Sequence, residues 1–235
     1  MGRLNDKVAV ICASRQDAQH GVAAGIAQRL RDEGARVALL GSPASKAEAE
    51  AAIADVLTRH GRIDILVNGA DESTDFSPLA SKSLAVAPSA QAVLWSLQAA
   101  YPALRERGGR VVNIVATMGD SLNRKLADGV AASEAIKSLT RSAAEEWGEH
   151  GVLVNALAVA ADTAVFRKLR EQAPEAVDAL VAQSPMQRMG DCEADIGGAV
   201  MLLVSEAGRF LTGHVLYADG GQHLTPTPFE AIVPM

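Results

Sequence analysis

The sequence GRIDILVNGAD, residues 61–71, contains the segment that decides the fold. Residues 63–68 form a short and mainly apolar run, which is flanked by Gly61 and Gly69. A strand that is covered by helices on both faces has this pattern, whereas a strand with one face in water alternates apolar and polar residues. The segment therefore predicts a buried strand of a parallel sheet.

The rest of the chain alternates in the same way between segments of strand length and segments of helix length. Further strands are expected at 7–12, 36–40, 110–115, 153–158 and 214–217. Helices, with apolar residues every three or four positions, are expected at 21–33, 47–59, 90–104, 130–147 and 194–204. This order predicts an α/β fold, a Rossmann-type doubly wound parallel sheet. We expect one domain over residues 1–222 and an extended, proline-containing tail over 223–235.

The bulk composition excludes several classes of function. Of the 235 residues, 49% are hydrophobic, and 22 Lys and Arg stand against 28 Asp and Glu, a net charge of −6. An acidic chain without a basic run is not expected to bind nucleic acid or an anionic membrane. The chain starts without a signal-peptide pattern and has no apolar run of membrane-spanning length, so we expect a cytoplasmic protein. Cys12 and Cys192 have no metal-ligand spacing, and no metal site is expected.

Seven segments together resemble the short-chain dehydrogenase/reductase family in their order and spacing. They are KVAVICASR (7–15), GVAAGIAQRL (21–30), GARVALL (34–40), GRIDILVNGAD (61–71), GGRVVNI (108–114), SLTRSAAEEWGEHGVLVNAL (138–157) and SPMQRMGDCEADIGGAVMLLVSEAGRFLTGHVLYADGGQ (184–222). The resemblance implies an oxidoreductase fold that binds NAD or NADP. Function, however, has to be argued from the sites.

The loop after the first strand departs from the family's pattern, a Thr-Gly-x-x-x-Gly-x-Gly turn whose glycines let the backbone approach the pyrophosphate. Ile11 and Cys12 stand at the Thr-Gly positions, and residues 16–20, QDAQH, are inserted. Gly21 matches the middle glycine and Ala23 the last one. Each lost glycine puts a Cβ where a phosphate or a positive φ is accommodated. The cofactor loop is therefore predicted to be degenerate.

The adenosine side of the family's cofactor site is also altered. The second strand ends at Leu40-Gly41-Ser42, without an acidic residue for the ribose hydroxyls. Between Leu40 and Asp64 there is room for one helix only, so a strand–helix unit is expected to be deleted after strand two. We therefore expect no cofactor to be bound by this chain, and NAD to be bound by an active partner subunit.

The family's four catalytic positions carry other residues here. In the family a Tyr acts as general acid/base, a Lys four residues later lowers its pKa, a Ser steadies the substrate oxygen and an Asn completes a proton relay. In that order, these positions hold Gly129, Ser133, Ala116 and Ser89. The resemblance therefore predicts a pseudoenzyme that has no activity on its own.

The absence of the tyrosine motif does not depend on this alignment. The chain has two tyrosines, Tyr101 and Tyr217, and neither is followed by a lysine four residues later. Both are expected to be packing residues. Other polar groups near the mouth of the family's active site are expected to be solvated surface charges, namely Asp71, Glu72, Asp75, Arg124, Lys125 and Glu134.

The segments that match the family well are those through which its members assemble. These are the helices at 89–106 and 130–147 and the segment 194–217. We expect them to join this chain to a homologous active subunit in a heterotetramer. The tail residues Phe229, Ile232 and Val233 are expected to dock on the partner. Two alternatives stay open: a regulatory module that binds a nucleotide or acyl-CoA in a remodelled pocket, and an enzyme with displaced catalytic groups.

Overall fold

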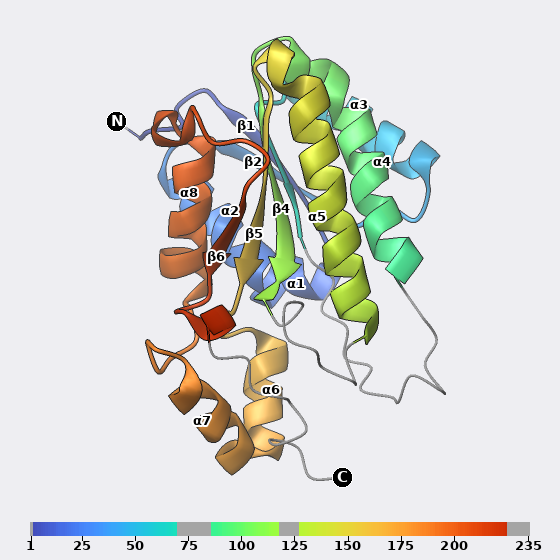
Figure 1. Ribbon diagram of the computed structural model, residues 1–235. Coiled ribbons are helices and arrows are strands. Elements are labelled where there is room, and N and C mark those ends of the chain that lie inside the picture. The colour runs from blue at the N-terminus through green and yellow to red at the C-terminus, as the bar shows by residue number, and fades with distance from the viewer. Residues whose placement is uncertain (1, 70–85, 118–126, 225–235) are drawn as a thin grey trace.

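The computed structural model describes residues 2–69, 86–117 and 127–224 (Figure 1). In these residues a parallel sheet of 6 strands has the order β2-β1-β3-β4-β5-β6. The strands are β1 (Val8–Ala13), β2 (Arg36–Gly41), β3 (Ile65–Asn68), β4 (Arg110–Ala116), β5 (Leu153–Val159) and β6 (Val215–Ala218). The Rossmann-type α/β fold predicted from the sequence is thereby confirmed.

Helices cover both faces of the sheet and one of its ends. The α-helices are α1 (Arg15–His20), α2 (Val22–Asp32), α3 (Lys46–His60), α4 (Val86–Arg105), α5 (Ala127–Trp147), α6 (Ala164–Gln172), α7 (Pro174–Gln183) and α8 (Gly198–Val204). A π-helical turn, η4 (Cys192–Gly197), leads into α8, and three 3-10 turns are η3 (Gly148–His150), η5 (Glu206–Gly208) and η6 (Gln222–Leu224). Figure 1 shows α3, α4 and α5 on one face, α2 and α8 on the other, and α6 and α7 beyond the carboxyl ends of the strands.

Alternate residues of β1 divide between two cores, as expected for a strand with both faces covered. Ala9 and Ile11 belong to the cluster under α2 and α8. Val8, Val10 and Cys12 belong to the cluster under α3, α4 and α5. The pleat of one short strand thus serves both layers, which explains why its apolar run is continuous.

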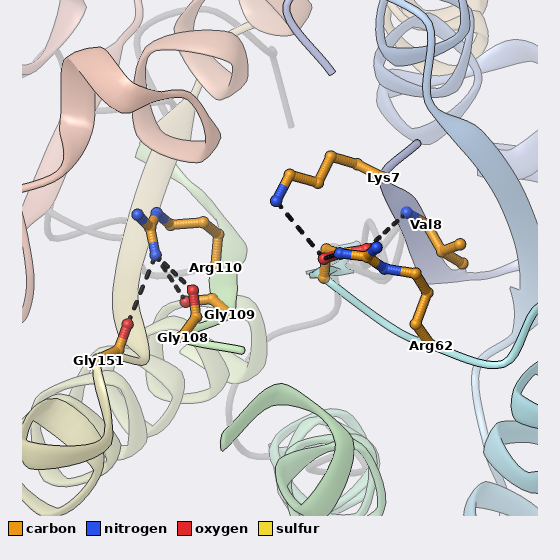
Figure 2. Close-up of polar contacts among 8 residues, drawn as sticks. Lys7, Val8, Arg62, Gly108, Gly109, Arg110 and Gly151 are labelled. Atoms are coloured by element: carbon orange, nitrogen blue, oxygen red, sulfur yellow. Dashed lines mark hydrogen bonds and ion pairs between the residues drawn. The ribbon is translucent and has the colours of Figure 1, made fainter. Parts of the chain in front are cut away.

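The buried carboxylate of Asp64 joins the amino ends of β1 and β3 (Figure 2). Asp64 Oδ2 accepts hydrogen bonds from the Val8 N–H at 2.9 Å and from Arg62 Nε at 2.8 Å. Lys7 Nζ lies 3.6 Å from Asp64 Oδ1. Burial alone would raise the pKa of Asp64, but the hydrogen bonds from Arg62 and Val8 outweigh it, so the pKa lies below its ordinary value.

A second cluster in Figure 2 holds the turn before β4 against the turn before β5. Arg110 Nη1 donates to the carbonyl oxygens of Gly108 at 2.7 Å, Gly109 at 3.2 Å and Gly151 at 3.5 Å. Gly108 and Gly151 both have φ of +69°, in the left-handed region that favours glycine. Both of these clusters lie at the amino ends of the strands, away from the edge where ligands bind in open α/β sheets.

Candidate functional site

The carboxyl ends of the strands form the edge at which open α/β sheets bind ligands. Among the described residues, this edge contains Ser14 after β1, Gly69 after β3, Thr117 after β4 and Ala160 after β5. Residues 70–85 and 118–126, which follow β3 and β4 in the sequence, lie outside the described residues. Five of the polar groups named from the sequence, Asp71, Glu72, Asp75, Arg124 and Lys125, fall there.

Helix α1 stands at this edge and was not predicted from the sequence. Its amino end is capped by Ser14, whose Oγ accepts the Asp17 N–H at 3.2 Å. Figure 1 shows α1 across the carboxyl ends of the strands. A signal for this helix was present, because a serine three residues before an acid is the pattern of a helix amino end.

The inserted residues place a carboxylate at the amino end of α2. Asp17 Oδ1 accepts the backbone N–H of Ala23 at 3.1 Å. The backbone N–H of Gly21, which is the N-cap of α2, donates to the Asp17 carbonyl at 3.0 Å. The first N–H groups of a helix have no partner within it and carry partial positive charge, so a carboxylate is stabilised there.

The four positions of the predicted cofactor loop are not gathered around one space. Ile11 and Cys12 are buried inside β1, in the two opposite cores. Burial raises the pKa of the Cys12 thiol to about 11. Gly21 and Ala23 lie at the start of α2, where the Asp17 carboxylate is bound. Both of these residues are buried as well.

A dinucleotide phosphate does not fit the described arrangement. A Cβ on Gly21 would lie 2.1 Å from Asp17 Oδ1, and a Cβ on Gly69 would lie 3.0 Å from Asp17 Oδ2. The space beside both glycines, where a phosphate would approach the backbone, therefore contains the Asp17 carboxylate. At the adenosine side, β2 ends at Gly41, and its Cβ position has no described atom within 4 Å.

The four positions that match the family's catalytic residues come from three elements. Ala116 is the last residue of β4, Gly129 and Ser133 lie in the first half of α5, and Ser89 lies near the start of α4. Figure 1 shows the carboxyl end of β4 and the amino ends of both helices on the same side of the molecule. A Cβ on Gly129 would meet no described atom within 4 Å.

Lys137 is a buried cation that the sequence did not single out. It follows Ser133 by four residues on α5 and is buried, and its Nζ lies 2.9 Å from Glu134 Oε1. Glu134, one of the charges named from the sequence, is itself mostly exposed. A buried ammonium needs partners, and Glu134 supplies one of them, so Lys137 is a candidate functional residue.

A chain of buried amides also crosses the sheet to α5. Asn68 Nδ2 donates to Asn113 Oδ1 at 2.8 Å, and Asn113 Nδ2 donates to Thr140 Oγ1 at 2.9 Å. The Thr140 hydroxyl donates in turn to the Ile136 carbonyl at 2.8 Å. These bonds fix α5 against β3 and β4, which positions Ser133 and Lys137 relative to the edge.

The two tyrosines have partners elsewhere. The Tyr101 ring stacks on Trp147 with ring centroids 4.4 Å apart, and its hydroxyl lies 3.2 Å from His150 Nδ1. The Tyr217 ring stacks on His223 with centroids 4.2 Å apart. Neither ring belongs to α5, the helix that contains Gly129.

In the part of the chain that the structure describes, no group of three or more His, Cys, Asp or Glu side chains is arranged to hold a metal ion. No helix in the described residues has the length and apolar character needed to cross a membrane.

The chain is similar to known reductases and dehydrogenases over most of its length. A family model described as enoyl-(acyl carrier protein) reductase matches residues 42–223. The 12α-hydroxysteroid dehydrogenase of Clostridium sp. is 32% identical over 190 residues, 79% of this chain and 73% of the relative. The 3-oxoacyl-acyl-carrier-protein reductase of Staphylococcus aureus is 29% identical and covers 75% of this chain and 73% of its own length. The crystal structure of levodione reductase has a TM-score of 0.85 at 25% identity, over 94% of this chain and 99% of that chain.

These findings correct one expectation drawn from the sequence. The replaced catalytic positions led us to expect a chain that is not an enzyme. Its relatives, over three quarters of its length, have the names of dehydrogenases and reductases, so that expectation is wrong. The physical reason is that replacement of one set of groups removes one route of proton transfer but does not exclude other groups at the same edge. By family model, relatives and fold alike, the chain belongs to the short-chain dehydrogenase/reductase family of oxidoreductases.

Proposed function

We propose that this chain is one of two homologous subunits of an NAD-dependent short-chain dehydrogenase that oxidises a hydroxyacyl thioester of the hydroxyacyl-CoA type. The two subunits form a heterotetramer through the helices at 89–106 and 130–147 and the segment 194–217. The proposed pair of subunits resembles the two-component 2-(α-hydroxybenzyl)succinyl-CoA dehydrogenase of anaerobic toluene degradation.

The main support for the proposed assembly is the exposed apolar surface of the segment 194–217. Phe210 is 98% exposed, Leu202 42% and Tyr217 40%. Strand β6, which contains Tyr217, is the last strand in the sheet order, and its outer edge has no partner strand among the described residues. Exposed large apolar side chains and an open strand edge each favour contact with another chain.

Helix α5 supports the same proposal on the opposite side of the molecule. Ala131, Ala135, Ser138 and Ser142 recur at the spacing of one helix face, and all four are exposed or half-buried. Small side chains at this spacing let a second helix approach closely. Trp95 on α4 is half-buried and adds an aromatic group to this side.

The names of two of the matches support the proposed substrate class. The family model and the Staphylococcus relative are both named for reductases of acyl groups on acyl carrier protein, in which the acyl group is a thioester. We therefore propose a hydroxyacyl thioester as the substrate class.

NAD is the cofactor we assign to the dehydrogenase, since the family generally binds NAD or NADP. We assign NAD binding to the homologous subunit, because the corresponding place in this chain, at the amino end of α2, contains the Asp17 carboxylate. We further propose that Ser89, Ala116, Gly129 and Ser133 stand at the family's four catalytic positions. None of them is a tyrosine, so in this proposal a tyrosine of this chain does not supply the proton transfer.

Lys137 favours a second candidate, an oxidoreductase whose catalytic groups are displaced within this chain. Oxidation of an alcohol needs a group that accepts the hydroxyl proton while the hydride leaves for the nicotinamide. The buried Lys137 amine, one helical turn beyond Ser133, would accept that proton in its neutral form. The purified chain would then turn over a hydroxyacyl-CoA with NAD, and Lys137→Met would abolish this turnover while Lys168→Met would not.

Purification of the tagged full-length chain from its native cells tests the main proposal. We expect a homologous chain with an intact Tyr-x-x-x-Lys motif to co-purify in stoichiometric amount, and the pair to form NADH from NAD and a 3-hydroxyacyl-CoA. A chain that elutes alone in native mass spectrometry would contradict the proposal. Calorimetry of the lone chain with CoA would then decide whether it is a regulatory module that binds an acyl-CoA.

A further inference from the structure

The contact between Asp17 and helix α2 has a consequence for the dinucleotide site. Asp17 Oδ1 accepts the Ala23 N–H at 3.1 Å, and the Gly21 N–H donates to the Asp17 carbonyl at 3.0 Å. The segment between β1 and α2 is therefore held against the amino end of α2 by its own hydrogen bonds. Its only acidic side chain is directed at the amino end of the helix that follows the first strand.

A carboxylate at this place carries the charge that a phosphate would bring. The amino end of a helix stabilises an anion through its N–H groups and its dipole. Asp17 uses one of those N–H groups, and its two oxygens occupy the space beside Gly21 and Gly69. A phosphate and the Asp17 carboxylate cannot occupy that space together.

Helix α1 can move without taking any buried side chain of its own out of the protein interior. None of the residues of α1 is buried. Its amino end is fixed by Ser14 and its carboxyl end by Gly21, whose N–H is bonded to the Asp17 carbonyl. Displacement of α1 therefore breaks a few hydrogen bonds but removes no apolar side chain from a protein interior.

We propose that Asp17 competes within the chain with a dinucleotide phosphate for the amino end of α2, so that the dinucleotide binds only when α1 moves away. The proposal rests on the function proposed above for the choice of ligand alone. Asp17 is thus a residue that determines whether this subunit takes up a dinucleotide.

Direct binding of NADH to the purified full-length chain, followed by fluorescence, tests the proposal. Asp17→Asn keeps the size of the side chain but removes its charge, and we expect NADH affinity to rise roughly tenfold or more, the usual gain for a charge-assisted hydrogen bond. Inorganic pyrophosphate, measured by calorimetry, should show a gain of the same direction. Asp32→Asn is the matched control, because Asp32 lies at the other end of α2 and bonds only to Gln28 in the described contacts. It should change the affinity less than about twofold.

A second variant and a second measurement guard against misfolding of the first. Ser14→Ala removes the N-cap of α1 but leaves the Asp17 charge, so NADH affinity should rise by a smaller factor, about two- to fivefold. In hydrogen exchange, saturating NADH should speed exchange of the α1 amides in the wild-type chain. Equal NADH affinity of the wild-type and both variants, or unchanged exchange in α1 on binding, would overturn the proposal. Since these measurements use the lone chain, a failure to find a homologous partner would leave their outcome unaffected.

Discussion

The Asp64 carboxylate accepts the backbone N–H of Val8 at 2.9 Å and so ties the start of β1 to the residue that precedes β3. Both residues are buried, and Asp64 also binds Arg62 and Lys7. The central strands β1 and β3 are thereby aligned at their amino ends by one side chain. The candidate site at the opposite ends depends on this register, because it sets where Ser14 and Gly69 stand.

Asp64→Asn is expected to lower the free energy of unfolding by roughly 2–4 kcal/mol, since it leaves Arg62 without its buried counter-charge. Asp55→Asn is the matched control, because its partner Arg59 is exposed on α3. That control should lose less than about 1 kcal/mol. Urea unfolding followed by circular dichroism measures both. Equal losses for the two variants would show that the Asp64 cluster is not a stabilising centre.

The dependence of stability on pH follows from carboxyl groups that, like Asp64, are paired with an arginine. The pKa values of Asp64 and Asp195 lie below their ordinary values, and hydrogen bonds from Arg3 lower the pKa of Glu33 to about 2. A carboxyl with a lowered folded pKa stabilises the protein above its unfolded pKa of about 4 and loses that effect as pH falls. The free energy of unfolding should therefore fall as pH drops from about 4 to about 2. Asp64→Asn should show a shallower fall over this range than the wild type.

Both cysteine thiols are expected to be slow nucleophiles at neutral pH. Burial raises the pKa of Cys12 to about 11, and burial together with the charges of Asp191 and Asp17 raises that of Cys192 to about 11. The thiolate is the reactive form, so its low population limits the rate. Alkylation mapped by mass spectrometry should label neither residue rapidly in the folded chain, whereas both should react after unfolding in urea. Rapid labelling of Cys12 in the folded state would contradict its burial.

The exposed apolar face of 194–217 gives a prediction about assembly. Phe210→Ser should leave the stability of the lone chain within about 0.5 kcal/mol, because the side chain is 98% exposed. It should weaken the complex with the homologous subunit, seen as dissociation at a higher protein concentration in native mass spectrometry. Met186→Ser, at a large apolar residue that is also exposed but lies outside this segment, is the control. Equal effects of the two substitutions on the complex would remove 210 from the interface.

The sequence predicted the strands and the long helices because their patterns are local. All six expected strands are present, with boundaries within two residues. The helix expected at 194–204 is correct from Gly198, but Cys192–Gly197 forms a π-helical turn, which apolar spacing does not distinguish from an α-helix. Helices α6 and α7 were missed, since they have only 9 and 10 residues and so give a short periodic pattern. The deletion of a strand–helix unit after β2 stays a prediction.

The candidate site was less predictable, because its contacts join residues that are distant in sequence or depend on how a loop folds. The insertion at residues 16–20 was visible, and so was the Ser14 and Asp17 spacing. That the Asp17 carboxylate would turn back onto Ala23 was not, since a longer loop has many conformations. The burial of Lys137 likewise depends on what packs against α5, and a lysine three residues after Glu134 suggests only a surface pair on a helix. The tail residues Phe229, Ile232 and Val233 lie outside the described residues.

The close approach of α2 to the π-helical turn gives the last prediction. A Cβ on Gly25 would lie 2.4 Å from the carbonyl carbon of Cys192, an atom of the backbone that cannot swing aside. Gly25→Ala should therefore destabilise the fold by about 1–3 kcal/mol through overpacking. Gly198→Ala is the matched control, because its Cβ would meet no described atom within 4 Å and its backbone is helical. In an open helical position alanine should instead add roughly 0.5–1 kcal/mol. Opposite signs in thermal unfolding are expected, and a neutral Gly25→Ala would mean that α2 does not rest on Cys192 at this distance.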